Sequence, residues 1–122
     1  MIFTAMALSV ATLGLSDLPP QKLEAGQCVT MLWSKGQPPI RIAMVDEKAQ
    51  ALQLQRNRRT VSLPATGPAS YAGEGLAVTL DLSFRQTDAI SNGAVVETGS
   101  MEITDASGEA LILPVGGMRA CR

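Results

Sequence analysis

The sequence predicts an all-β domain, a small antiparallel barrel or sandwich of about seven to eight short strands closed by one disulfide. Three observations support this prediction. Apolar and polar residues alternate with period two along several short segments, and turn-forming residues separate these segments. No long stretch beyond residue 16 has helical periodicity. Cys28 and Cys121 stand near the two ends of that part of the chain, so a bridge between them would close the sheet edge.

The N-terminal residues resemble a targeting segment. Residues 1–16 contain no charge and no proline, and they form an apolar run like the h-region of a signal peptide. Gly14 and Ser16 put small residues at the two positions that a signal peptidase recognises. We therefore expect 1–16 to be a signal segment and 17–27 an extended, proline-bearing lead-in. Because no Lys or Arg precedes the run, a buried helix and an uncleaved anchor remain as alternatives, although the run is shorter than the roughly 20 residues that span a bilayer.

Residues 28–122 are expected to form the single β domain. Strict alternation predicts strands at 28–34 and 40–44. A hairpin follows at 52–63, in which Asn57 supplies the positive φ angle of a tight turn.

The second half begins with a segment rich in proline and glycine, 64–75, which is expected to be a loop. Residues 76–84 alternate over nine positions and predict a half-buried antiparallel strand. Strands are also expected at 94–104, with a bulge at Gly99, and at 109–113. The prolines and glycines after residue 113 are expected to end the regular structure.

The composition argues against an enzyme. The chain has no histidine, the usual general base and the commonest metal ligand, so a Ser-His-Asp or Cys-His site is excluded. No carboxylate spacing selects a catalytic pair or a calcium loop. The net charge of −1 and an aromatic content of 3% offer nothing for nucleic acid. We expect no enzymatic activity, no metal and no cofactor.

The two cysteines bear on location. Behind a signal segment, two cysteines indicate a disulfide and an oxidising compartment. We therefore expect a periplasmic or otherwise exported protein that contacts the membrane only through its N-terminal segment or a partner complex.

Two groups of residues are candidate binding sites. Arg56, Arg58 and Arg59 cluster on one hairpin tip, where they could hold a carboxylate or phosphate; the alternative, which we favour, is a solvated tip. The small residues that end in Ser70 and the sole tyrosine, Tyr71, resemble a recognition loop and form the preferred candidate.

The sole tryptophan, Trp33, could anchor a partner or fill the core. It shares an alternating face with Val29 and Met31, and we therefore expect it in the core.

The two ends of this domain resemble an uncharacterised family of small exported proteins of alphaproteobacteria. The resemblance rests on Leu18-Pro19-Pro20-Gln21 before Cys28, on Leu32-Trp33, and on Pro114-Val115 before Cys121. It implies export and the disulfide, and it implies no activity.

The middle of the chain is similar in architecture to the periplasmic C-type lysozyme inhibitors, which are small disulfide-bearing barrels. The hairpin at 52–63 and the loop that ends in Ser70-Tyr71 carry this resemblance. In that family a loop Ser and a later Lys enter the lysozyme cleft. Here Ser70 lies directly before the Tyr, and no Lys follows Lys48.

The sequence thus predicts a small exported β domain that acts by binding a protein, in an inhibitor-like manner. The alternative is an accessory or structural subunit of a membrane-associated envelope complex.

Overall fold

The fold is all-β in the computed structural model, which describes residues 13–36, 39–86 and 94–122. These residues contain nine strands and no helix, and hence no helix long and apolar enough to cross a membrane. The strands are β1 (Leu15–Ser16), β2 (Cys28–Ser34), β3 (Arg41–Asp46), β4 (Ala51–Arg56), β5 (Arg59–Gly67), β6 (Ser70–Gly73), β7 (Leu76–Gln86), β8 (Ala94–Asp105) and β9 (Ala110–Cys121).

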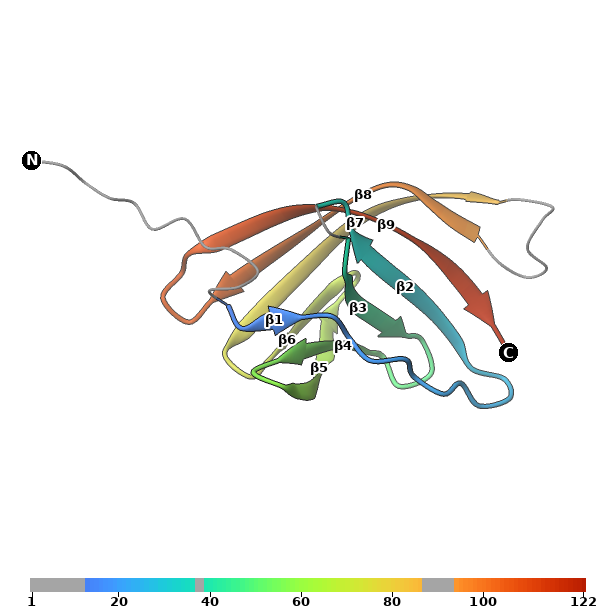
Figure 1. The fold of residues 1–122 in the computed structure, drawn as a ribbon, viewed down its shortest axis with the longest axis horizontal. Helices are drawn as coiled ribbons and strands as arrows, with labels where there is room; N and C mark the ends of the chain where they lie inside the picture. Colours follow the sequence, from blue (N-terminus) through green and yellow to red (C-terminus); the bar gives the residue numbers. More distant parts are fainter. Residues whose placement is uncertain (1–12, 37–38, 87–93) are drawn as a thin grey trace, which may run out of the picture.

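Strands β2 to β9 form a closed antiparallel barrel of the up-and-down type (Figure 1). Each strand from β2 onward pairs with the next one along the chain, and β2 also pairs with β9, which closes the ring. The remaining strand, β1, is not part of the ring. It pairs with the C-terminal end of β4, where Leu15 lies opposite Arg56, while β3 pairs with the N-terminal part of β4, from Ala51 to Gln53. The prediction of a small closed β domain is confirmed, and a barrel rather than a sandwich is the form it takes.

The pairing of β2 with β9, here called the seam, joins the first and last strands of the barrel. Cys28 lies opposite Cys121 in register, and the two form the predicted disulfide. The pairing continues past the disulfide, because the amide of Gly26 donates to the carbonyl of Arg122 at 2.7 Å, and the amide of Arg122 donates to the carbonyl of Gln27 at 2.9 Å. The disulfide therefore fastens the edge that the sequence predicted it would close.

The two backbones of the seam come unusually close at Gly117. A Cβ atom placed there would overlap the carbonyl oxygen of Met31 on β2. Glycine is therefore required by the close approach of a neighbouring backbone, one of the uses of glycine inside a strand.

Two predictions about local structure are wrong. Residues 64–75 are not a loop, because β5 continues to Gly67 and turns back as β6. Pro68 followed by Ala69 with φ of 55° is what a type II turn requires, so the proline marks a two-residue hairpin connection. Nor does the regular structure end after residue 113. Strand β9 runs to Cys121, and Pro114 is accommodated beside the irregularity of β8 between Val96 and Ser100.

The other strands appear where the alternation predicts them. The predicted segments at 28–34, 76–84 and 94–104 correspond to β2, β7 and β8, and the bulge expected at Gly99 lies within the register shift of β8. Asn57 has the expected positive φ, 51°, in the β4–β5 turn.

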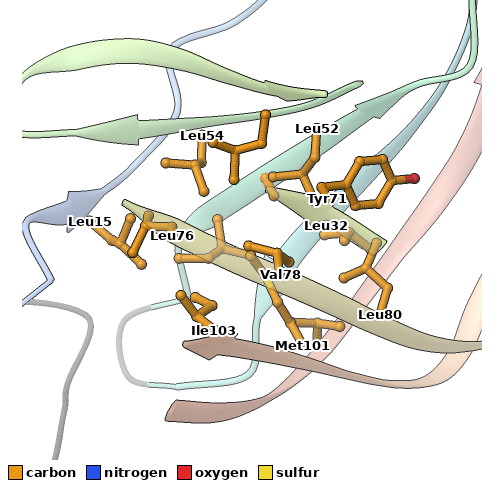
Figure 2. Packing of buried hydrophobic residues seen from close by; sticks show 14 of the residues in the cluster. Leu15, Leu32, Leu52, Leu54, Tyr71, Leu76, Val78, Leu80, Met101 and Ile103 are labelled. Carbon is orange, nitrogen blue, oxygen red and sulfur yellow. The ribbon is translucent and has the colours of Figure 1, made fainter. Parts of the chain in front are cut away.

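The inward-facing side chains form one apolar core that fills the barrel (Figure 2). Leu32, Leu52, Leu63, Met101 and Ile103 have no exposed surface. Complete burial of a leucine or isoleucine side chain stabilises the fold by roughly 1.5–3 kcal/mol, so this core is the main source of stability.

A second, smaller cluster lies outside the barrel. Leu18 is fully buried against Val29 and Met44, with Leu23 and Met31 packed beside them. The expected lead-in, residues 17–27, thus packs along the outer face of β2 and β3.

The prediction that Trp33 lies in the core is wrong. Leu32 faces inward with no exposed surface, and its neighbour Trp33 therefore points outward and is 36% exposed. The alternating face of Val29, Met31 and Trp33 is real, but it is the outer face of the barrel.

Candidate functional site

The two ends of the barrel differ in the side chains that cover them. At one end, here called the closed end, Leu13 and Leu15 are only 4% and 5% exposed, and Leu15 lies beside Leu76 in Figure 2. At the other end, here called the open end, the hydroxyl of Tyr71 points away from this leucine cluster (Figure 2). The strand ends at Asp46, Ala51 and Gly67 lie on the same side as Tyr71.

Two adjoining hollows occupy the open end. One has a volume of about 430 Å³ and the other a volume of about 460 Å³, and both are lined by a mixture of apolar and polar groups. Val45, Glu47 and Tyr71 line both hollows, so the two hollows share part of their wall. The first is completed by Thr30, Ala69, Leu80, Asp81, Leu82 and Phe84. The second is completed by Asp46, Gln50, Ala65 and Gly67.

An aromatic pair distinguishes the first hollow. The chain has one tyrosine, one tryptophan and two phenylalanines, and Tyr71 and Phe84 both line this hollow. Tyr71 is 9% exposed, whereas Phe84 is 47% exposed and is among the large apolar side chains left open to solvent. An exposed aromatic residue beside a recess is typical of an anchor for a binding partner.

An ion pair fixes the rim of the open end. The guanidinium of Arg119, on β9, donates from Nε to Oε1 of Glu47 at 2.6 Å and from its terminal nitrogen to Oε2 at 2.9 Å. This two-point contact links the last barrel strand to the turn after β3. The hydrogen bond from Arg119 lowers the pKa of Glu47, whereas burial raises the pKa of the Tyr71 phenol, and the charge of Glu47 raises it further. At neutral pH the rim therefore presents a neutral phenol donor beside a paired carboxylate.

The ion pair makes a testable prediction about pH. Because the pKa of Glu47 is lowered in the folded protein, its contribution to stability is present above its ordinary value of 4.5 and is lost as the pH falls through the lowered value. The two side chains are 35% and 43% exposed, so the contribution is below about 1 kcal/mol. We expect Arg119→Gln to raise the pKa of Glu47 toward 4.5, as followed by the carbon chemical shift of its carboxyl group in an NMR titration.

The control for this titration is Arg85→Gln, which removes an exposed arginine on β7 that has no part in the ion pair. An unchanged Glu47 titration in Arg119→Gln would show that the contact with Arg119 does not determine this pKa.

The structure separates the candidate binding residues predicted from the sequence. Ser70 and Tyr71 begin β6 at the open end, and Tyr71 lines both hollows. The Ser70 hydroxyl donates to the carbonyl of Pro68 at 3.4 Å, within the same hairpin turn.

The arginines lie at the closed end, on the β4–β5 turn. The guanidinium of Arg56 donates to the carbonyl of Leu13 at 3.1 Å and to the carbonyl of Glu74. Arg59 makes an exposed ion pair with Glu74 at 3.9 Å, and Arg58 is exposed with φ of 65°. Arg56 thus holds neighbouring chain segments together, and the cluster does not share a surface with Tyr71.

Sequence reasoning missed the other members of the open end. Glu47 and Arg119 are 72 residues apart, and no local pattern connects them. In the sequence, Phe84 continues the apolar face of β7, and the alternation therefore predicts that it lies in the core. In the structure it is exposed at the rim of the barrel, after the irregularity in pairing between Ser83 and Phe84. Within the described ranges, no group of three potential metal-ligating side chains comes together.

No protein-family model, curated protein or solved structure matches this chain.

Proposed function

We propose that this protein is an exported, periplasmic binding domain that holds a segment of a protein partner at the open end of its barrel, in the manner of an inhibitor, and is not an enzyme. The observation that carries the proposal is the recess beside Tyr71 and Phe84, rimmed by the Glu47–Arg119 ion pair. Aromatic anchors within a polar rim are the usual composition of a protein-binding surface.

The disulfide supports the exported location, because such bonds persist in oxidising compartments. The open end also suits a protein partner better than an enclosed small molecule. Both hollows lie at the rim, where Glu47 and Phe84 are exposed, and the closed end is filled by core leucines. A partner loop would place an apolar side chain against Phe84 and a polar group near Tyr71.

The first test uses C-type lysozyme, because the hairpin at 52–63 and the segment that ends in Ser70-Tyr71 resemble, in sequence pattern, the periplasmic inhibitors of that enzyme. The purified protein is expected to slow lysis of cell walls when added in molar excess. We expect Tyr71→Ala and Phe84→Ala each to weaken inhibition at least tenfold, a loss of about 1.4 kcal/mol of binding. Arg58→Ala, at the opposite end, is the matched control and should retain full inhibition. Full lysozyme activity at high excess of the wild-type protein would exclude the inhibitor form of the proposal.

A second measurement tests binding to other envelope proteins. A photoreactive amino acid at Ala69, which lines the first hollow, should give one discrete cross-linked product in the native envelope, and the same group at Arg58 should not. The product should disappear when Tyr71→Ala is added. Equal products from both positions, or none from either, would contradict binding at the open end.

One observation favours a second candidate, an accessory subunit of an envelope complex. Trp33, Ile112 and Met118 are large apolar side chains on the outer face of β2 and β9, exposed by 36%, 64% and 38%. Exposed apolar groups of this kind occur at subunit contacts. If the protein is such a subunit, it should migrate in a stable assembly after gentle membrane extraction; migration as a free monomer would argue against it.

A further inference from the structure

The residues just before the lead-in belong to the folded barrel. Leu13 and Leu15 are 4% and 5% exposed and are members of the main core cluster. Leu15 and Ser16 form β1, which pairs with β4 (Figure 1). A polypeptide that begins at Asp17 would lack this strand and both core leucines.

Backbone contacts hold the same segment in place. The carbonyl of Gly14 accepts from the amide of Asn57 at 2.9 Å, and the carbonyl of Leu13 accepts from Arg56 at 3.1 Å. Gly14 has φ of 74°, and a Cβ atom there would overlap the side chain of Asn57. Specific contacts thus hold Leu13 and Gly14 in place, as they hold residues inside a folded domain.

These contacts conflict with signal cleavage after Ser16. Cleavage there would leave the end of β4 paired with β5 alone, and it would leave a gap in the core where two leucines had been. A processing site compatible with the fold must lie before Leu13.

The sequence offers such a site. Ser9 and Ala11 place small residues three and one positions before the Ala11–Thr12 bond, the pattern that a signal peptidase recognises. At least eight residues, largely apolar, precede this pair, which is within the length of an h-region. The earlier small pairs, Ala5 with Ala7 and Ala7 with Ser9, leave a shorter apolar segment before them.

We propose that a signal peptidase cleaves the bond between Ala11 and Thr12, so that the exported protein begins one residue before the first core leucine. Water is consumed in the step: its hydroxyl completes the carboxyl group of Ala11, and its hydrogen completes the amine of Thr12. The inference rests on the exported location included in the proposed function, and it is independent of what the open end binds.

To test this, the full chain is expressed in a Gram-negative host, and the intact mass and the N-terminal sequence of the periplasmic protein are measured. The expected protein begins at Thr12 and lacks residues 1–11. A protein that begins at Asp17, a protein that begins elsewhere, or a chain that keeps Met1 would overturn the inference. Because the measurement involves no partner, its failure is distinguishable from failure of the binding proposal.

A pair of variants locates the recognised residues. Ala11→Gln should block cleavage and leave the precursor uncut, because glutamine is too large for the position before the cut. Ser16→Gln, which alters an exposed side chain of β1, should still yield a protein that begins at Thr12. Loss of cleavage in Ser16→Gln with normal cleavage in Ala11→Gln would assign the cut to the later site. Both variants are read by mass, so the result does not depend on how well either one folds.

Discussion

Removal of the disulfide with the double substitution Cys28→Ser and Cys121→Ser is expected to lower the free energy of unfolding by about 4–5 kcal/mol. The two cysteines are 93 residues apart, so the bond constrains nearly all of the described chain in its unfolded state. Such a loss is comparable with the whole stability of many small domains, and the variant should be partly unfolded at 37 °C.

Urea unfolding followed by the fluorescence of Trp33 measures this loss, since Trp33 is the sole tryptophan and lies on β2. Wild-type protein treated with a reductant should unfold at the same urea concentration as the double variant. A loss below about 1 kcal/mol would mean that the seam holds the chain ends together without the covalent bond.

Substitution of Gly117 by alanine is expected to cost about 3 kcal/mol or more, at the upper end of the usual cost of adding a methyl group to a packed interior. The new Cβ would overlap the carbonyl oxygen of Met31, which belongs to the backbone of β2 and cannot move without disturbing the seam. Thermal unfolding monitored by circular dichroism reports the loss as a lower midpoint temperature.

The neighbouring glycine provides a matched control. A Cβ on Gly116 would lie 3.4 Å from the Cε atom of Lys35, and that flexible side chain can move away. Gly116→Ala should therefore change stability by less than about 0.5 kcal/mol. Equal effects of the two substitutions would show that the close approach at Gly117 is not what requires glycine there.

The fold could be predicted largely because inward and outward residues alternate along single strands. Strand β7 shows this best: Leu76, Val78 and Leu80 point into the core and the residues between them do not. The disulfide was predictable from two cysteines and their placement. The alternation along β2 defines two faces but does not show which one points into the barrel. The face that carries Trp33 is the more hydrophobic, so it was predicted to be the inner face, and it is the outer one.

Proline and glycine led to two wrong predictions, a loop at 64–75 and an end of regular structure after residue 113, for different physical reasons. Pro68 lies in a two-residue turn whose positive φ angle falls on Ala69, a residue that gives no turn signal. Gly117 lies in a strand because a second backbone passes beside it, which is a property of the assembled barrel.

The candidate site was predictable only in part. Tyr71 was identified from its place among small residues, and it does line the open end. Its neighbour Glu47 lies in the turn after β3, and Arg119 lies on β9, 72 residues further along the chain, so the proximity of these two side chains depends on closure of the barrel. The arginine cluster was visible as a charge run, but a charge run carries no information about which end of a barrel it occupies.

The seam also has a consequence for how fast the protein folds. The other seven pairings of the barrel join consecutive strands, so each can form by closing a short loop. The β2–β9 pairing is different, because it joins segments about 90 residues apart. The chain loses conformational entropy when it brings these segments together, and only then do the contacts between them form and offset that loss. We therefore expect the search for this one pairing to limit the rate at which the reduced chain folds. Once the disulfide has formed, the two strands remain neighbours even in the unfolded chain, and later refolding no longer includes that search.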